Sequence, residues 1–228
     1  MKVCVRNYTI STSNNVRNIG AYFDSNFLMT NQINNIIKSA WFQLRKIGQI
    51  RKYLDKSSAE RLIHAFVSSR LDQNNSLLYG LPLSQIDRLQ RLQNAAARML
   101  MLISPEPGVH ISPVLFKLHW LPVQYRIQFK LLLLVYKSLN NKGPAYLSSL
   151  LVEKNKNKVL RSNEFQELDI SKVKTLKMYG DRAFEIAGPK LWNKFIKDTD
   201  MKGCMSVNSF KAALKTYLFK VAYRDFLN

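Results

Sequence analysis

Apolar residues recur at helical spacing between residues 31 and 47. They are Ile33, Ile36, Ile37, Ala40, Trp41, Leu44 and Ile47, which fall on one face of an α-helix. The whole chain of 228 residues holds only eight glycines and seven prolines. Because sandwiches and barrels need many turns, this low number of turn-forming residues favours long helices. The sequence therefore predicts a mainly α protein that contains a long amphipathic helix.

Similar patterns predict further helices downstream. Ser57 followed by Glu60 is typical of a capping box, and Ser84 is expected to cap a later helix. The predicted helices cover approximately residues 57–70, 74–79, 85–102, 111–118, 122–140, 182–187 and 206–223. The inward-facing residues of the helix at 85–102 are expected to be Ile86, Leu89, Ala96 and Leu100.

The amino-terminal residues have a different pattern. Two β-prone runs, residues 2–10 and 16–24, flank a polar turn at residues 11–15, which predicts a single short β-hairpin. Farther along, the alternating Lys and Asn residues of 154–158 are typical of a linker. We therefore expect three regions: the hairpin at 1–28, a helical bundle at 29–143, and a basic linker with a helical C-terminal extension at 144–228.

The chain is strongly basic. It carries 35 Lys and Arg against 15 Asp and Glu, a formal net charge of +20. Its 46% hydrophobic residues are enough for a packed core, so the charge is not that of a disordered chain. An imbalance of this size favours a polyanionic partner. Residues 1–150 hold 19 of the basic residues and 6 of the acidic ones, which places most of the excess on the predicted bundle.

Two groups of basic residues are candidates for phosphate contacts. They are Arg45, Lys46, Arg51 and Lys52 at the end of the first helix, and Arg88, Arg91 and Arg98 along one stripe of the helix at 85–102. Arginine suits bidentate phosphate contacts, which position a nucleic-acid backbone without reading its sequence. The helix dipole is an alternative explanation for the first group, and a solvated charged face for the second. Residues 154–177 hold seven basic and three acidic residues, and we interpret them as a linker.

The sequence has no pattern typical of a catalytic or metal site. His64, His110 and His119 lack metal-ligand spacing, and no glycine-rich phosphate loop is present. The acidic residues are dispersed, and their one near pair, Asp198 and Asp200, is expected in a turn. We therefore expect no catalytic residues, no bound metal or cofactor, and no small-molecule substrate.

Cysteine usage and hydropathy bear on location. Cys4 and Cys204 lie far apart in the sequence, which indicates reduced thiols rather than a disulfide framework. The first residues include charges and no apolar run typical of a secretory signal. The most apolar run, residues 129–139, contains two lysines and is shorter than the roughly 20 residues that span a bilayer. We expect an intracellular protein of the cytoplasm or nucleus, without a membrane partner.

Six short segments have an order and spacing typical of one family. They read VRNIGAYFD at residues 16–24, AFVSSRLD at 65–72, NSLLYGLP at 75–82, RLQRLQNAAAR at 88–98, LHWLPV at 118–123 and YGDRAF at 179–184. Together they resemble the carboxyl-terminal part of reverse transcriptases encoded by non-LTR (LINE-type, jockey- or CR1-like) retrotransposons. The resemblance spans most of the chain. It implies the end of a polymerase palm at 1–28, a helical thumb at 29–143 and an extension at 144–228.

This resemblance implies a parent RNA-directed DNA polymerase whose palm binds Mg²⁺ through aspartates, one pair of them in an aromatic-x-Asp-Asp motif. No Asp-Asp occurs here, and the resemblance begins downstream of that motif. The implied molecule is a truncated fragment without fingers or catalytic palm, which is not an enzyme as it stands. Gln73 and Asn74 replace the Tyr-Cys usual in similar sequences, a change that affects no catalytic expectation.

In such polymerases the thumb helices hold the RNA–DNA template-primer duplex, so the implied role of the seven basic residues is to contact its backbone. The palm and fingers of a parent polymerase are a second expected partner. Two other interpretations stay open. The chain is either an α-helical protein-interaction module that docks through apolar surface, or part of a full polymerase whose gene model was cut short.

Overall fold

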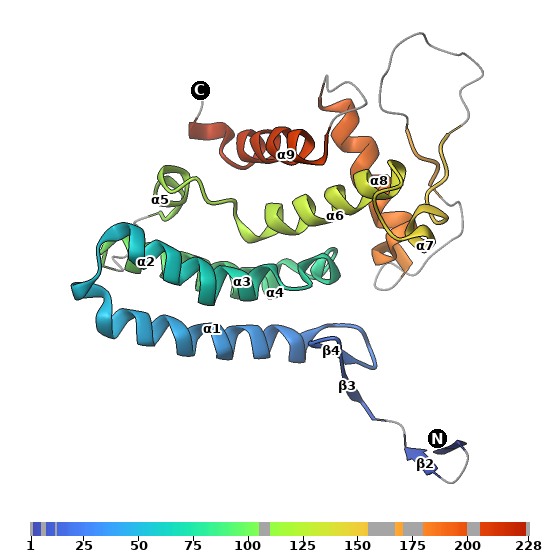
Figure 1. The fold of residues 1–228 in the computed structure, drawn as a ribbon, viewed down its shortest axis with the longest axis horizontal. Helices are drawn as coiled ribbons and strands as arrows, with labels where there is room; N and C mark the ends of the chain where they lie inside the picture. Colours follow the sequence, from blue (N-terminus) through green and yellow to red (C-terminus); the bar gives the residue numbers. More distant parts are fainter. Residues whose placement is uncertain are drawn as a thin grey trace.

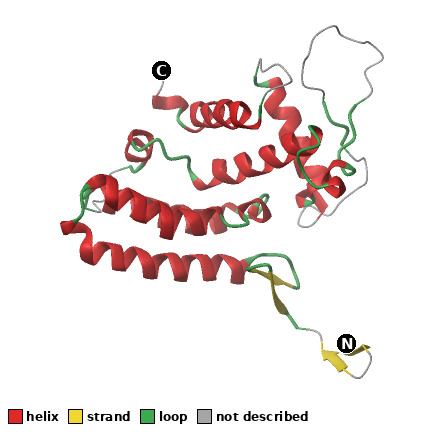
Figure 2. Ribbon diagram, viewed as in Figure 1, coloured by secondary structure: helices red, strands yellow, loops and turns green. Residues whose placement is uncertain are grey.

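The computed structural model describes residues 2–5, 8–11, 13–104, 110–154, 167–170, 180–199 and 206–226. Most of them are helical, and the prediction of a mainly α fold is confirmed (Figure 2). The strands are β1 (Lys2–Val5), β2 (Tyr8–Ser11), β3 (Asn15–Asn18) and β4 (Ala21–Asp24). The α-helices are α1 (Thr30–Ile50), α2 (Lys56–Ile63), α3 (Ser69–Asp72), α4 (Leu83–Met101), α5 (Ser112–Lys117), α6 (Val123–Leu139), α7 (Ala145–Ser148), α8 (Phe184–Lys197) and α9 (Val207–Ala222). Shorter turns are the 3₁₀ helices η1 (Arg51–Tyr53), η3 (Asn75–Leu78), η4 (Gly180–Arg182) and η5 (Arg224–Phe226), and the π-helix η2 (His64–Ser68).

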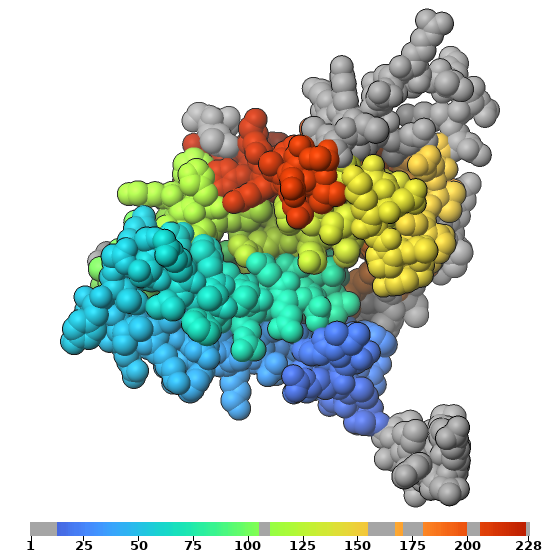
Figure 3. Space-filling view, in the orientation of Figure 1, coloured from blue at the N-terminus to red at the C-terminus, as the bar shows by residue number. Residues whose placement is uncertain are grey.

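The helices are arranged in layers. Figure 1 shows α1 along one edge, then α2, α3 and α4, then α6, with α9 at the opposite edge. Helix α1 packs against α4 and η2, α4 packs against α6, and α6 packs against both α8 and α9. In the space-filling view, α1 (blue to cyan) and α9 (red) lie on opposite sides of the molecule (Figure 3). Helix α6 is therefore the central element of the bundle.

The apolar face predicted for the first long helix is buried as expected. Five of its seven residues are buried in a core shared with α2, α4 and α5: Ile33, Ile36, Ala40, Leu44 and Ile47. Full burial of a side chain of this size stabilises the fold by about 1.5–3 kcal/mol. The face predicted for the helix at 85–102 is also confirmed, because Ile86, Leu89, Ala96 and Leu100 are all buried. Ile37 is partly buried against this core, and Trp41 is an exception, since 37% of its surface stays exposed.

A second core forms around α6, α8 and α9. Tyr136 and Phe210 stack there with 3.8 Å between their ring centroids, and Trp192 is fully buried beside them. The predicted helix at 182–187 is too short, since α8 continues to Lys197 through Pro189. A proline inside a helix costs about 3 kcal/mol, and burial of the aromatic residues in the second half of α8 offsets that cost. A Cβ at Gly188 would lie 3.0 Å from Cγ2 of Val135, so α8 and α6 approach closely at this glycine.

The regions predicted at 29–143 and 144–228 meet along α6, which contributes buried residues to both cores. Tyr223, just beyond α9, is buried in the first core. The division of the chain at residue 143 stays a prediction. The linker-like residues 155–158, Asp200 and Cys204 lie outside the described residues, as does the side chain of Cys4.

The amino-terminal strands differ from the prediction. Strand β1 pairs with β2, and β3 pairs with β4, each in an antiparallel two-stranded sheet. The prediction of one hairpin with a turn at residues 11–15 is therefore wrong. Strands β3 and β4 are joined by Ile19 and Gly20, whose φ angles of 46° and 80° are those that the tight two-residue turn of a hairpin requires. The backbone N–H of Tyr22 in β4 donates to Oε1 of Gln32 at 3.0 Å, which joins this hairpin to α1.

Two helix starts also differ. The cap of α2 is Asp55, whose Oδ1 accepts a hydrogen bond from the Ser58 N–H at 3.2 Å, so the Ser57 capping box is wrong. Hydrogen bonds from the side chain and from the backbone N–H of Ser58 lower the pKa of Asp55. Glu60 accepts instead from Nε1 of Trp120 at 3.3 Å. Helix α4 begins directly after Pro82, before Ser84 has any capping role. Proline limits the residues before it and starts helices readily, and this effect outweighs the serine signal.

Candidate nucleic-acid interface

The outward side of α1 combines cations and aromatic rings. Lys38, Arg45 and Lys46 are exposed there, together with Phe42 (51% exposed) and Trp41 (37% exposed). We call these five residues the α1 face. Residues 25–54, which include all of α1, contain no Asp or Glu. Among the described residues, none of these three cations forms an ion pair. No acidic residue of 25–54 therefore offsets the positive charge of the α1 face.

Helix α4 runs parallel to α1. At one end, Nη2 of Arg88 donates to Oδ1 of Asn34 at 2.6 Å, and at the other end a Cβ on Gly48 would lie 3.1 Å from Cε of Met99. Trp41 lies seven residues, or two helical turns, from both Asn34 and Gly48, and Arg91 lies three residues after Arg88. Residues at these spacings share one side of a helix, so Trp41 is on the α4 side of α1 and Arg91 is on the α1 side of α4. Arg91 is exposed. Its charge therefore adjoins the α1 face.

The three arginines predicted as a stripe on α4 have different surroundings. Arg88 is half-buried, and its other nitrogen, Nη1, donates to Oε1 of Gln85 at 2.9 Å. Arg98 is also half-buried, and its Nε is fully shielded from solvent. Of the three, only Arg91 is exposed. The structure thus brings Arg88 and Arg91 to the border with α1, and places Arg98 farther along the helix with less access to a partner.

The prediction for Arg51 requires a correction. This side chain is buried, with 8% of its surface exposed. Its guanidinium donates to the carbonyl oxygens of Leu54 (2.8 Å), Leu100 (2.8 Å) and Met99 (3.3 Å). The last two belong to the end of α4, where helix carbonyls lack partners within the helix. Arg51 is therefore a capping residue that fixes α4 to the end of α1, and it does not face a phosphate.

Lys46 and Lys52 both rest on neighbouring rings. The Nζ of Lys46 lies 4.5 Å from the centroid of Phe42, and that of Lys52 lies 4.8 Å from the centroid of Tyr53. Both lysines are exposed, and such contacts contribute only about 0.5–1 kcal/mol at exposed sites. The two ammonium groups can therefore leave their rings to meet an anion. Lys38 was absent from the sequence-based candidates, although its position seven residues before Arg45 indicates the same face.

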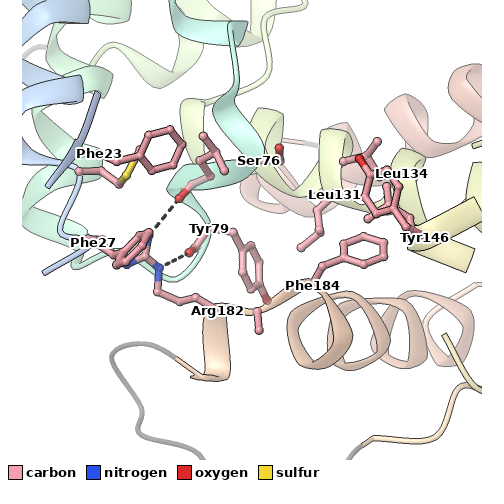
Figure 4. Close-up of a pocket in the computed structure, with 13 residues that line it drawn as sticks. Phe23, Phe27, Ser76, Tyr79, Leu131, Leu134, Tyr146, Arg182 and Phe184 are labelled. Atoms are coloured by element: carbon pink, nitrogen blue, oxygen red, sulfur yellow. Dashed lines mark hydrogen bonds between the residues drawn. The ribbon is translucent and has the colours of Figure 1, made fainter. Parts of the chain in front are cut away.

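Two of the six family-like segments meet at Arg182. Its Nη1 donates to the Phe27 carbonyl at 2.7 Å, its Nη2 to the Leu77 carbonyl at 3.0 Å and its Nε to the Tyr79 carbonyl at 3.1 Å (Figure 4). Burial lowers the pKa of Arg182, and the charge of Asp24 partly offsets that effect. We call these three bonds the Arg182 latch. They join the segment at 179–184 to the segment at 75–82 and to the loop before α1.

The other segments also form junctions. Nε2 of Gln93 donates to the Leu121 carbonyl at 2.9 Å, and Oε1 of Gln90 accepts from the Val123 N–H at 2.8 Å, so α4 holds the link between α5 and α6. Arg126 of α6 forms a bidentate ion pair with Asp72. The residues that carry the resemblance therefore include the contacts that hold the helices together.

A cavity of about 620 Å³ lies beside the Arg182 latch (Figure 4). Its largest lining side chains are Phe23, Phe27, Tyr79, Tyr146, Arg182 and Phe184. Burial raises the pKa of Tyr79, which keeps its hydroxyl neutral. No carboxylate or histidine belongs to the lining among the described residues. The cavity is thus mainly apolar and presents no acid–base pair.

Within the described ranges, no group of three or more His, Cys, Asp or Glu side chains is placed to hold a metal ion. None of the helices in those ranges has the length and hydropathy needed to cross a membrane. Comparison of the chain with protein-family models, with curated proteins and with solved structures finds no match.

Proposed function

We propose that this chain binds the sugar-phosphate backbone of an RNA–DNA duplex through the α1 face, with Arg91 and Lys52 at its borders. The proposed role is that of a thumb derived from a non-LTR retrotransposon reverse transcriptase. Binding would be largely independent of sequence, because phosphate contacts carry no base information. The role is one of binding rather than catalysis, and it places the chain in the cytoplasm or nucleus, where the palm and fingers of a parent polymerase would be a further partner.

One observation carries the proposal. In the 30 positions of residues 25–54 there is no acidic residue, and the outward side of the helix formed there presents Lys38, Arg45 and Lys46 to solvent. A surface helix of ordinary composition mixes both signs of charge. Here the field is of one sign, and each cation that neutralises a phosphate releases a counterion, which is the main source of affinity for a duplex.

The same face supports a second candidate function. Trp41, Phe42, Ile50 and Tyr53 expose between 37% and 76% of their surfaces along α1 and η1. Exposed aromatic residues, such as three of these four, are typical of the central part of protein–protein interfaces. A protein-interaction module would use these rings and would depend weakly on salt.

Salt dependence separates the two candidates. The affinity of the chain for a fluorescent RNA–DNA duplex is measured by anisotropy from 0.05 to 0.4 M salt, for the wild type and for the triple variant Lys38→Gln, Arg45→Gln, Lys46→Gln. Each lost phosphate contact lowers the slope of log affinity against log salt by about 0.9. If all three residues contact phosphate, the slope falls by about 2.7, equivalent to about 500-fold weaker binding at 0.1 M salt.

The matched control removes the same charge from the opposite side of the molecule. It is the triple variant Lys211→Gln, Lys215→Gln, Lys220→Gln on α9. We expect the slope of log affinity against log salt for this variant to differ from the wild-type slope by less than about 1, since the variant loses no phosphate contact. Equal slopes for the two triple variants, or a wild type whose affinity does not fall with salt, would overturn the proposal.

A further inference from the structure

We propose that the α1 face binds unpaired nucleotides as well as duplex backbone, with bases stacked on Phe42 and Trp41 and phosphates held by Lys38, Arg45 and Lys46. This inference rests on the proposed function and specifies the nucleic acid that the same site takes. The partner class is a single strand, or the single-stranded segment next to a duplex.

The two rings are placed between the cations. Lys38 and Arg45 are seven residues apart, which is two helical turns or about 10 Å along α1. Trp41 and Phe42 each lie three or four residues from both of them, so ring and cation alternate on one surface. Phe42 is 51% exposed and Trp41 is 37% exposed. One strand of stacked nucleotides advances about 3.4 Å per phosphate, so this surface fits roughly three nucleotides.

Exposed rings have no use in backbone recognition of a duplex. The faces of paired bases are covered by the neighbouring base pairs, so a duplex offers the α1 face only phosphates. An unpaired strand offers both phosphates and open base faces, and proteins that bind single strands combine a basic surface with aromatic platforms in this way. The duplex therefore uses the cations of the α1 face alone, and the single strand uses the cations and the rings.

Charge decides between a nucleic acid and a protein as the occupant of these rings. A protein partner that covered Phe42 and Trp41 with apolar side chains would also desolvate three cations that no acidic residue of 25–54 neutralises. A polyanion neutralises them instead. Lys46, whose Nζ already lies 4.5 Å from the Phe42 centroid, exchanges its ring contact for a phosphate when a base takes its place.

The test uses a labelled 12-nucleotide single-stranded RNA and an RNA–DNA duplex of the same sequence, with the full chain and its Phe42→Ala variant. Loss of one stacked base weakens single-strand binding by about 5- to 150-fold. We expect such a loss for the single strand, an unchanged affinity for the duplex, and an unchanged salt slope for both, because no cation is removed. Tyr146→Ala removes an exposed ring from α7 (69% exposed) and is the matched control.

Fluorescence of Trp41 gives a second readout. The other two tryptophans are buried, with 5% of Trp120 and 0% of Trp192 exposed. Stacking of a base on Trp41 therefore quenches the fluorescence of the exposed tryptophan when single-stranded RNA is added. The Trp41→Phe variant should not show this quenching. Phe42→Leu keeps an apolar side chain without a ring, so it tests stacking with less risk to folding.

The outcomes separate this inference from the proposed function. If single strand and duplex bind with steep salt dependence and Phe42→Ala weakens neither, stacking is refuted and the duplex function stands. If Phe42→Ala and Phe42→Leu weaken both ligands equally, the selective use of the rings is refuted. If neither ligand binds in a salt-dependent way, the proposed function itself fails, and this inference fails with it.

Discussion

Replacement of Arg182 by methionine removes all three bonds of the Arg182 latch while keeping a long unbranched side chain. The carbonyl groups of Phe27, Leu77 and Tyr79 then lose their donor. A hydrogen bond to a charged group contributes about 1.5–3 kcal/mol when shielded, and an ordinary one about 0.5–1.5 kcal/mol. The bonds to Phe27 and Leu77 are exposed to solvent, and the bond to Tyr79 is partly buried.

With the lower range for the two exposed bonds and the higher range for the third, the free energy of unfolding falls by about 2.5–6 kcal/mol. For a chain of this length, 1 kcal/mol shifts the melting temperature by about 2–4 °C, so the melting temperature should fall by at least about 5 °C. Thermal unfolding followed by far-ultraviolet circular dichroism measures it. Lys190→Met is a matched control, because its ion pair with Asp181 is exposed and contributes about 0–1 kcal/mol.

Gly80 supplies an independent check of the same contact. Its φ angle is +74°, and a Cβ there would lie 2.8 Å from Cγ of Arg182. Gly80→Ala therefore suffers both backbone strain, about 1–2 kcal/mol, and a clash with the latch. In the Arg182→Ala background the clash disappears and the strain remains. We expect a coupling energy above about 0.5 kcal/mol in this double-mutant cycle. An additive cycle, or an Arg182→Met variant as stable as the wild type, would refute the latch.

Two further predictions concern the core. Arg51→Met removes three hydrogen bonds: the carbonyl groups of Leu54 and Leu100 lose their Arg51 donor, and that of Met99 keeps only its bond from the Leu102 N–H. The substitution should lower the free energy of unfolding in urea by about 3 kcal/mol, without changing the salt slope of duplex binding; a lower slope would return Arg51 to the interface. Burial raises the pKa of Tyr223 above its ordinary value near 10, so the unfolded chain loses this proton first and stability falls above pH 10. This loss amounts to about 1.4 kcal/mol between pH 9 and pH 11, and Tyr223→Phe should remove it, as urea midpoints over that range would show.

The buried faces of the long helices could be predicted because buried positions recur in the sequence at the helical period. Ile33, Ala40 and Leu44 are buried in α1, and Ile86 and Leu89 in α4, at the positions that the apolar spacing indicates. Such periodicity depends only on which side of the helix meets the core. The buried side of a helix can therefore be predicted without knowledge of the helix that packs against it.

Features set by single contacts could not be predicted in this way. Phe66 lies three and four residues from Ile63 and Leu62, a spacing that predicts burial on one side of the helix at 57–70. The π-helix η2 changes the period there and leaves Phe66 43% exposed. A turn at Ile19 and Gly20 requires two positive φ angles, which an isoleucine rarely adopts, and this concealed the β3–β4 hairpin. These outcomes depend on local backbone geometry rather than on hydropathy.

The candidate site shows the same limit. Arg45, Lys46 and Lys52 lie on the surface as expected, whereas Arg51, next to Lys52 in the sequence, is directed into carbonyl groups of α4. Charge runs indicate a basic region, but they do not distinguish a side chain that meets solvent from one that caps a neighbouring helix. That distinction requires the position of α4, which contacts 48 and 49 residues apart determine.

Ultraviolet cross-linking of the wild-type chain to a labelled RNA–DNA duplex with a single-stranded overhang locates the contact directly. After tryptic digestion, mass spectrometry identifies the peptides that carry nucleotide. We predict cross-links in the peptide of residues 39–45, which contains Trp41 and Phe42, and in its α1 neighbours. Cross-links confined to α8 and α9 would contradict the assignment of nucleic-acid binding to the α1 face.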